Sequence, residues 1–323
     1  MKDYLVSLER LQEAAAVVYE SLAPTPQYAW PLLQSALGAQ IWVKHENHTP
    51  IGAFKLRGGL VYFRDLAQRG KPAGVISATR GNHGQSVGFA ARQHGIPATI
   101  VIPQGNSAEK NAAMRALGVE LIEHGEDFQA AKERASWIAQ QRGLHMVPSF
   151  HPLLVHGVAS YSLELLRAVP DLDVVYVPIG MGSGICGMIA ARNALKHRVE
   201  VVGVVSTQAP AYALSLEQGR AVEHSVTTRI ADGLACRTPE PAALDILQKG
   251  MARVVRVSDD EIEAAMCRMY SATHNGAEGA GAAALAAAWQ ERGRLAGRKI
   301  GVVLSGGNVD REVFSRVLAG ELH

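Results

Sequence analysis

The sequence has few cysteines, no apolar run of membrane-spanning length and no N-terminal basic stretch followed by an apolar core. Its three cysteines, Cys186, Cys236 and Cys267, are odd in number and far apart, without the pairing typical of metal or redox sites. Buried free thiols and a reducing compartment are the interpretation that this favours. We therefore expect no secretory signal and no membrane span, and a cytoplasmic protein.

An excess of charge of one sign is also missing. The 32 Lys and Arg residues nearly balance the 30 Asp and Glu residues, for a formal net charge of +2. No basic block is present that could follow a phosphate backbone, so we expect no nucleic-acid partner. The 48% hydrophobic and 19% charged residues are typical of a globular protein, and 323 residues favour two interdependent domains.

Short apolar runs alternate with longer segments rich in Ala, Arg and Gln. The runs comprise residues 41–43, 74–78, 98–102, 119–122, 174–178, 199–205, 254–257 and 299–304. Near-continuous apolar strands between helical segments predict an α/β fold, with a mostly parallel sheet covered on both faces. The closely spaced strand–helix units of residues 74–148 predict a small domain, inserted into a large domain made of residues 1–68 and 152–323.

One lysine, Lys55, stands between Phe54 and two glycines in the stretch A-F-K-L-R-G-G, where a helix is expected to begin. A lysine in apolar surroundings has a lowered amine pKa and becomes a nucleophile toward aldehydes. Taken alone, an exposed lysine near a helix start is the simpler interpretation.

Three turns rich in small residues each follow a predicted strand: T-R-G-N-H-G-Q (79–85), G-M-G-S-G-I-C-G (180–187) and S-G-G-N (305–308). Backbone N–H groups of the first turn could bind a substrate carboxylate, and those of the second could wrap a phosphate at a helix start. Each turn alone has an ordinary structural explanation. Because ligands gather at the strand ends along one edge of a parallel sheet, the three turns together predict one site.

The second turn also contains the pattern G-x-G-x-x-G in residues 182–187, which is typical of dinucleotide-binding folds. That interpretation is strongest when an acidic residue ends the next strand and binds the ribose. The next strand here ends in Val205-Ser206-Thr207. An NAD(P)-dependent oxidoreductase therefore stays open only as a remote hypothesis.

In their order along nearly the whole chain, these segments resemble the fold-type-II pyridoxal-phosphate (PLP) family. This family contains threonine and serine dehydratases, serine racemase and cysteine synthase. The lysine motif is similar to the family's S-F-K-x-R-G-A, and residues 79–85 resemble its asparagine loop. His83 favours the dehydratase branch, because cysteine synthases usually carry Asn-Thr where this chain has Asn82-His83.

The resemblance implies PLP as the cofactor, a two-lobed fold, a small amino-acid substrate as the binding partner, and a homodimer. Lys55 would form the Schiff base with PLP, and Phe54 would pack against the cofactor ring. Asn82 would bond the 3-hydroxyl, Gly233 would lie beside the ring, and Ser305 would face the pyridine nitrogen. Five residues would hold the phosphate: Gly180, Met181, Gly182, Ser183 and Gly184.

The implied activity is elimination of water and ammonia from a β-hydroxy amino acid of the threonine or serine type. Five residues would form the substrate loop: Thr79, Arg80, Gly81, Asn82 and His83. Arg80 stands where racemases have serine, which weakens the case for a racemase. Its guanidinium could bind a second substrate carboxylate, as in threo-3-hydroxyaspartate, or turn to solvent. Racemisation and β-replacement on the same fold also stay open.

No metal is expected. Members of the family that use a divalent cation usually carry a glutamate in a G-V-E-P-type segment, and this chain has Val205 in G-V-V-S. His45 and His48 have a spacing that metal ligands can have, but no cysteine or carboxylate cluster accompanies them.

Overall fold

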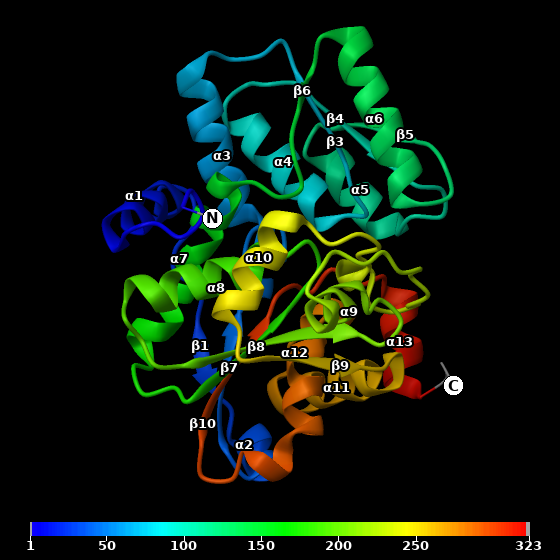
Figure 1. The fold of residues 1–323 in the computed structure, drawn as a ribbon. Coiled ribbons are helices and arrows are strands. Elements are labelled where there is room, and N and C mark those ends of the chain that lie inside the picture. The colour runs from blue at the N-terminus through cyan, green and yellow to red at the C-terminus, as the bar shows by residue number, and fades with distance from the viewer. Residues whose placement is uncertain (1, 321–323) are drawn as a thin grey trace.

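The computed structural model describes residues 2–320, and this part of the chain contains two sheets with helices around them (Figure 1). The six-stranded sheet has the order β1-β2-β10-β7-β8-β9, and the four-stranded sheet has the order β5-β4-β3-β6. Neighbouring strands are parallel except β1 and β2, an antiparallel pair at one edge. The predicted α/β fold is confirmed.

The strands of the six-stranded sheet are β1 (Gln27–Ala29), β2 (Gln40–His45), β7 (Val174–Pro178), β8 (Glu200–Ser206), β9 (Arg253–Val257) and β10 (Lys299–Leu304). Those of the four-stranded sheet are β3 (Val75–Ala78), β4 (Ala98–Ile102), β5 (Glu120–Glu123) and β6 (His145–Met146). The α-helices are α1 (Leu8–Tyr19), α2 (Pro31–Leu37), α3 (Lys55–Arg69), α4 (Asn82–Gln93), α5 (Ala108–Ala116), α6 (Phe128–Arg142), α7 (Pro152–Ala168), α8 (Ser183–Ala194), α9 (Ala211–Gln218), α10 (Pro241–Gly250), α11 (Asp259–Thr273), α12 (Gly279–Gln290) and α13 (Arg311–Ala319). Three short 3₁₀ helices complete the set: η1 (Glu46–His48), η2 (Asp232–Leu234) and η3 (Arg292–Arg294).

Each of the eight apolar runs in the sequence forms a strand. The two strands that the pattern does not predict are β1 and β6, which are three and two residues long. Neither contains a buried residue, so neither leaves an apolar run to be found. Burial on both faces makes the central strands, such as β3, β4 and β7, visible in the sequence.

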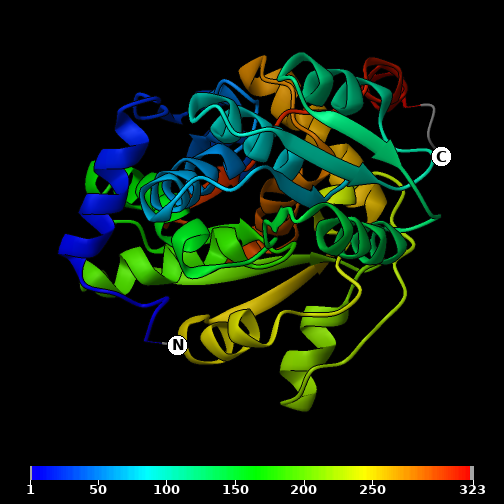
Figure 2. The ribbon, with the colours of Figure 1, turned by 90° about the horizontal axis from the view of Figure 1, so that it is seen from above.

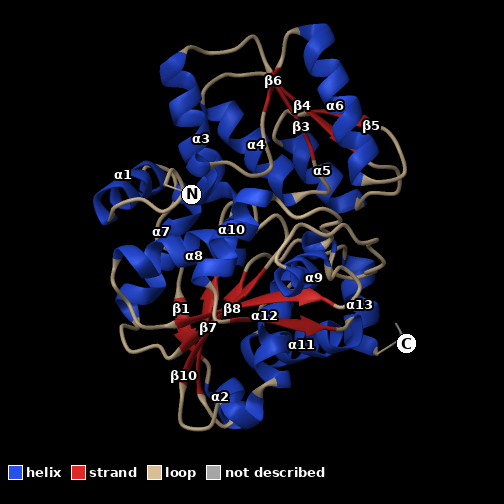
Figure 3. Ribbon diagram, viewed as in Figure 1, coloured by secondary structure: helices blue, strands red, loops and turns tan. Residues whose placement is uncertain are grey.

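Side chains that alternate along β7 explain why helices cover both faces of the six-stranded sheet. Val174 and Tyr176 pack into a core with the Ala-rich helix α12 and with α11. Val175 and Val177 point the other way and pack with α7 and α8. This period of two is the ordinary geometry of a strand. Figure 3 shows the strands enclosed by helices.

The four-stranded sheet is covered in the same way. Ile100 of β4 packs with α3, α4 and α5, whereas Val101 packs with α6 on the opposite face.

The two termini of the described chain lie far apart: α1 runs along one side of the molecule and α13 lies on the other (Figure 2). None of the helices in residues 2–320 is long and apolar enough to cross a membrane.

Candidate active site

The chain reaches Lys55 through a tight connection after β2, and α3 begins at this residue. Phe54 N–H donates a hydrogen bond of 3.0 Å to the carbonyl oxygen of Ser305, and Ala53 forms an isolated bridge with Gly306. These backbone contacts fix the start of α3 against the end of β10. The lysine motif and the S-G-G-N turn lie near opposite ends of the sequence and are neighbours in the fold.

The Lys55 amine points at the start of α8. Its Nζ donates a 3.0 Å hydrogen bond to Ser183 Oγ and lies 5.0 Å from the centroid of the Phe54 ring. Loss of hydration on burial lowers the pKa of Lys55 to about 8. An amine with this pKa is partly unprotonated near neutral pH, which is the state in which it can attack an aldehyde.

The glycine-rich loop before α8 leaves the first N–H groups of this helix without a side-chain cap. Gly182 has a φ of 99°, in the left-handed region that favours glycine, and a Cβ there would lie 2.8 Å from Ala243 Cβ. A Cβ on Gly180 would lie 2.2 Å from the carbonyl oxygen of Gly233, so this loop and η2 touch. Uncapped N–H groups at a helix start form a ready site for an anion such as phosphate.

The rest of this loop is fixed by two tyrosines. Tyr161 Oη donates to the carbonyl oxygen of Gly184 at 3.1 Å, and Tyr212 Oη donates to that of Met181 at 3.0 Å. Both tyrosines are buried. Because these carbonyl oxygens are bonded to protein, the N–H groups are the part of the loop that is left for a ligand.

The asparagine loop follows β3 and leads into α4. Gly81 N–H donates to Thr79 Oγ1 at 3.0 Å, which shapes the turn. Asn82 Nδ2 donates to Glu278 Oε1 at 2.6 Å, and Asn308 Nδ2 donates to Asn82 Oδ1 at 2.8 Å. The asparagine loop is thus joined to the S-G-G-N turn and to the start of α12.

His83 lies next to Asn82 and close enough to Lys55 for their charges to interact. Burial first, and the Lys55 charge second, lower the pKa of His83 to about 3, so its ring is neutral at physiological pH. Among residues 2–320, its buried Nε2 atom has no hydrogen-bond partner. A buried ring nitrogen without a partner is an observation that favours a ligand here.

Arg80 and Ser305 differ in how firmly the protein holds them. Arg80 is half-buried, and its guanidinium makes no hydrogen bond or ion pair with the part of the chain that the structure describes. Ser305 is buried, and its Oγ donates a long hydrogen bond of 3.4 Å to the carbonyl oxygen of Ala280. Arg80 is therefore free to bind a ligand, whereas Ser305 is fixed at the end of β10.

A buried network of charges anchors the first turn of α3. Arg57 Nε donates to Glu46 Oε2 at 2.6 Å, and its Nη1 donates to Glu164 Oε1 at 2.7 Å. Lys44 Nζ donates to Glu164 Oε2 at 2.5 Å. Two cations and two carboxylates balance, as buried charges must. Because Arg57 is two residues from Lys55, this network fixes the helix end that carries the amine.

A second cluster of charges is centred on Lys110 of α5, a residue that the sequence interpretation did not single out. Lys110 Nζ lies 2.7 Å from Asp232 Oδ2 and 3.2 Å from Glu278 Oε2. Glu278 occupies the N-cap position of α12, but its side chain does not bond the N–H groups of that helix and accepts from Asn82 instead. Lys110 sits in an ordinary polar helix, which gives no sequence signal for a role at the site.

Metal ligands are not assembled in the described residues. No group of three or more His, Cys, Asp or Glu side chains in residues 2–320 is placed to hold an ion. His45 and His48 stack at 5.0 Å between ring centroids, and Trp30 Nε1 donates to His45 Nε2 at 3.0 Å. His45 is a fully buried strand residue, held by aromatic neighbours.

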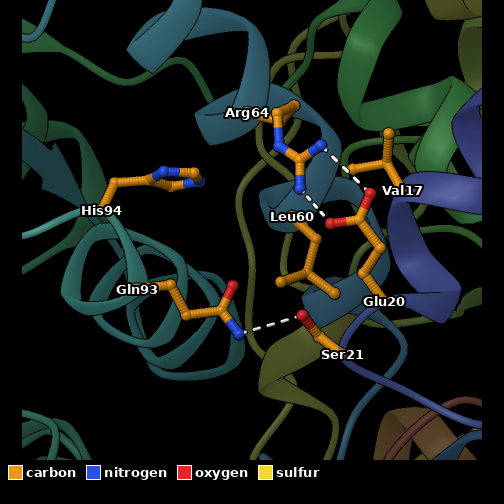
Figure 4. A pocket seen from close by; sticks show the side chains of 7 residues that line it. All are labelled: Val17, Glu20, Ser21, Leu60, Arg64, Gln93 and His94. Atoms are coloured by element: carbon orange, nitrogen blue, oxygen red, sulfur yellow. Dashed lines mark hydrogen bonds and ion pairs between the residues drawn. The ribbon is translucent and has the colours of Figure 1, made fainter.

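A pocket of about 310 Å³ lies away from these motifs, between α1, α3 and α4 (Figure 4). Arg64 forms an ion pair with Glu20 across it, and Gln93 donates to Ser21 Oγ at 3.0 Å. These polar side chains bond one another, and none belongs to the motifs described above.

Residues 18–306 match the family model described as "Pyridoxal-phosphate dependent enzyme", and the chain belongs to this family. PLP, not a nicotinamide, is therefore its cofactor. The residues fit this group: an amine of lowered pKa, an uncapped helix start lined by glycine, and a buried ring nitrogen without a described partner lie around one place.

Curated relatives cover most of the chain. It is 32% identical to the "L-threonine ammonia-lyase" of Thermotoga maritima over 97% of this chain and 78% of that protein. It is 29% identical to the "L-threo-3-hydroxyaspartate ammonia-lyase" of Saccharomyces cerevisiae over 96% of this chain and 95% of that protein. The chain spans 63% of the length of the biosynthetic L-threonine dehydratase of Haemophilus influenzae.

A solved structure agrees with this family. The structure of maize serine racemase superposes with a TM-score of 0.90 at 28% identity, over 99% of this chain and 98% of that one. The predicted fold-type-II PLP architecture is thereby confirmed.

Proposed function

We propose that this PLP-dependent enzyme removes water and ammonia from a β-hydroxy amino acid of the threonine or serine type and forms a 2-oxo acid. The observation that carries the proposal is the Lys55 amine, whose pKa is lowered to about 8 and which faces Ser183 at the start of α8. An unprotonated amine is needed both to bind an aldehyde and to take a proton from carbon. The names of the ammonia-lyases from Thermotoga maritima and Saccharomyces cerevisiae support this reaction class.

Bound PLP supplies an aldehyde carbon for an amine and a ring that withdraws electrons from the substrate. Lys55 would hold the aldehyde carbon and, once displaced by the substrate amine, would remove the Cα proton. Phe54 and Gly233 would flank the ring, Asn82 would donate to the 3-hydroxyl, and Ser305 would face the pyridine nitrogen. The phosphate would lie against the loop formed by Gly180, Met181, Gly182, Ser183 and Gly184.

The asparagine loop would bind the substrate. N–H groups at the start of α4, with Thr79, Gly81 and Asn82, would hold the Cα carboxylate. His83 is neutral, because burial lowers its pKa to about 3, and would offer Nε2 to the substrate. Lys55 would take the Cα proton, and the Cβ hydroxyl would leave as water once protonated, so that the released product would be an enamine. After release, the enamine takes up water and gives the 2-oxo acid and ammonia.

Arg80 favours a substrate with a second acidic group beyond Cβ, for which threo-3-hydroxyaspartate is the simplest candidate. Its guanidinium makes no hydrogen bond or ion pair within the described chain, and a carboxylate would satisfy two of its N–H groups at once. The yeast relative acts by name on this substrate. The same arginine makes racemisation a weaker candidate, because it stands where racemases have serine.

We also propose the assembly in which this reaction takes place. Residues 1–68 and 152–323 would form a large domain that binds PLP, and residues 74–148 a small domain that carries the asparagine loop. Each of the two sheets falls within one of these parts. Resemblance favours a homodimer, and the free thiols of Cys186, Cys236 and Cys267 favour the cytoplasm. Light scattering after size-exclusion chromatography tests the dimer.

A panel of four substrates tests the proposed reaction: serine, threonine, threo-3-hydroxyaspartate and phenylserine, each read by release of 2-oxo acid and ammonia. The expected result is stoichiometric release of both products from at least one of them. Racemised amino acid without ammonia from every substrate, or a β-substituted product without ammonia when a thiol is added as nucleophile, would replace the lyase by another reaction on the same fold.

A further inference from the structure

A chain of hydrogen bonds determines which way the side-chain amide of Asn82 faces. The oxygen and nitrogen ends of an asparagine amide have nearly the same shape, so the orientation is assigned from the hydrogen-bond partners. Here the assignment starts from a backbone carbonyl. Asn308 Nδ2 donates to the carbonyl oxygen of Ile51 at 2.8 Å, and this oxygen can only accept.

Asn308 therefore presents its nitrogen, and the same Nδ2 atom donates its other hydrogen to Asn82 Oδ1 at 2.8 Å. The carbonyl end of the Asn82 amide is thereby assigned to the Asn308 side. On the opposite side, Asn82 Nδ2 donates to Glu278 Oε1 at 2.6 Å. The Ile51 carbonyl, the Asn308 amide and the Glu278 carboxylate thus all favour the same orientation of the Asn82 amide.

Two glycines make room for this arrangement. A Cβ on Gly306 would lie 2.4 Å from Glu278 Oε1, and a Cβ on Gly81 would lie 2.5 Å from Lys110 Cδ. Both distances are too short for any real Cβ contact. Any side chain at these two positions would have to move Glu278 or Lys110.

Lys110 compensates the buried carboxylate of Glu278. Burial raises the pKa of Glu278, and the Lys110 ammonium, 3.2 Å from Oε2, opposes that rise. Asn82 bonds the other oxygen, Oε1, which accepts a hydrogen bond whether or not Oε2 carries a proton. As long as Oε1 carries no proton it can only accept, so Asn82 must present its nitrogen to Glu278.

We propose that Glu278 and Asn308 are positioning residues that hold the Asn82 amide so that its nitrogen, rather than its oxygen, serves the cofactor. This inference rests on the proposed role of Asn82 as the donor to the 3-hydroxyl of PLP. Asn82 Nδ2 carries two hydrogens, and one is given to Glu278. The second has no acceptor in residues 2–320, so it is available to an oxygen of the cofactor.

The test reverses both partners. In the Asn308→Asp variant an acceptor replaces the donor. The aspartate at position 308 and Glu278 then both need the nitrogen of the Asn82 amide, which can face only one of them. In the double variant Glu278→Gln with Asn308→Asp, both partners are satisfied if the amide turns over, because glutamine can donate to its oxygen and aspartate can accept from its nitrogen. Asn275→Asp is the matched control: Asn275 accepts from Asn47 and bonds His48, not Asn82.

Two measurements read the result: the dissociation constant of PLP from the apoenzyme and the melting temperature of the apoenzyme. We expect Asn308→Asp to lower the melting temperature and the double variant to regain part of it. The double variant should nevertheless bind PLP about tenfold more weakly than Glu278→Gln, the loss expected for one hydrogen bond to a charged group. The control should bind PLP like the wild type.

PLP affinity in the double variant equal to that of Glu278→Gln would overturn the inference. If Asn308→Asp does not fold, Asn308→Ala takes its place, alone and combined with Glu278→Gln. Each single variant then keeps one of the two hydrogen bonds that orient the Asn82 amide. The fold-loss of PLP affinity in the combined variant must therefore exceed the product of the two single fold-losses. A combined loss equal to that product would overturn the inference. PLP binding is measured without substrate, so failure of the lyase proposal in the substrate panel is a separate result.

Discussion

Lys55 Nζ and Ser183 Oγ are 3.0 Å apart, and this hydrogen bond joins the first residues of two helices, α3 and α8, that are 128 positions apart in sequence. The amine that would hold the cofactor thus lies at the positive end of the helix that would hold its phosphate. A neighbouring helix start disfavours a further positive charge, as burial does, and both favour an unprotonated amine.

Replacing Lys55 by Ala should reduce turnover nearly to zero, because one amine would serve as both the covalent anchor and the base. PLP should still bind through the loop before α8, but borohydride should no longer fix it to the protein. The measurements are ammonia release and cofactor retained after borohydride and denaturation. Lys132→Ala, at an exposed position of α6, is the control. Normal turnover in Lys55→Ala would show that another residue is the anchor.

The rate at which the apoenzyme captures PLP should depend on pH through Lys55. Burial lowers the pKa of this amine to about 8, so the reactive unprotonated fraction rises as pH increases through that value and is complete above it. Stopped-flow absorbance should show a rate that rises to a plateau above about pH 9. A rate that keeps rising toward pH 10.5, the ordinary value for lysine, would mean that the amine is solvated.

Exhaustive chelation should leave activity unchanged. Val205 stands where the metal-dependent members carry a carboxylate, and Asp232, an acidic side chain near the site, is already bound by Lys110. Turnover is to be measured before and after dialysis against a chelator, with magnesium and calcium added back separately. Loss of activity that either ion restores would contradict this prediction.

Arg80→Ala should affect one substrate more than the others. If its guanidinium binds a distal carboxylate, kcat/KM should fall much more for threo-3-hydroxyaspartate than for serine and threonine. The difference should correspond to roughly 2 kcal/mol of transition-state stabilisation. Arg80→Lys, which keeps the charge and loses the planar fork, should recover only part of the difference. An equal fall for all substrates would show that Arg80 only supports the loop.

The buried network at the start of α3 should contribute far more to stability than a surface pair on the same helix. Arg57→Met leaves Glu46 and Glu164 short of a cation and should lower the free energy of unfolding by about 3–5 kcal/mol. Arg64→Met, which removes only the exposed pair with Glu20 shown in Figure 4, should change it by about 0–1 kcal/mol. Urea denaturation monitored by circular dichroism compares the two variants.

The sequence predicts those parts of the molecule that leave a local pattern. Buried strands such as β7 appear as apolar runs, and Ser7 is a residue type that favours the N-cap of a helix, as it does for α1, where its Oγ accepts from Arg10 N–H. The α/β fold and the family follow from such patterns and from the order of the motifs. The edge strand β1 has no buried residue and leaves no run to recognise.

The partners within the site could not be predicted in this way. Lys110 meets Glu278 and Asp232 only because the chain folds back over more than a hundred residues. No local periodicity records such a contact. Glu278 is an example: it stands at the N-cap position of α12, but its side chain does not cap that helix and accepts from Asn82 instead.

The fit of Gly306 against Glu278, and of Gly81 against Lys110, has a consequence for how such sequences diverge. A Cβ at either glycine position would have to displace Glu278 or Lys110 from their ion pair, so we expect a single change at one position to be disfavoured unless its partner changes too. Positions 81, 110, 278 and 306 should therefore be inherited as a block. In an alignment of descendants, we expect alanine at 306 only where the residue at 278 is shorter than glutamate.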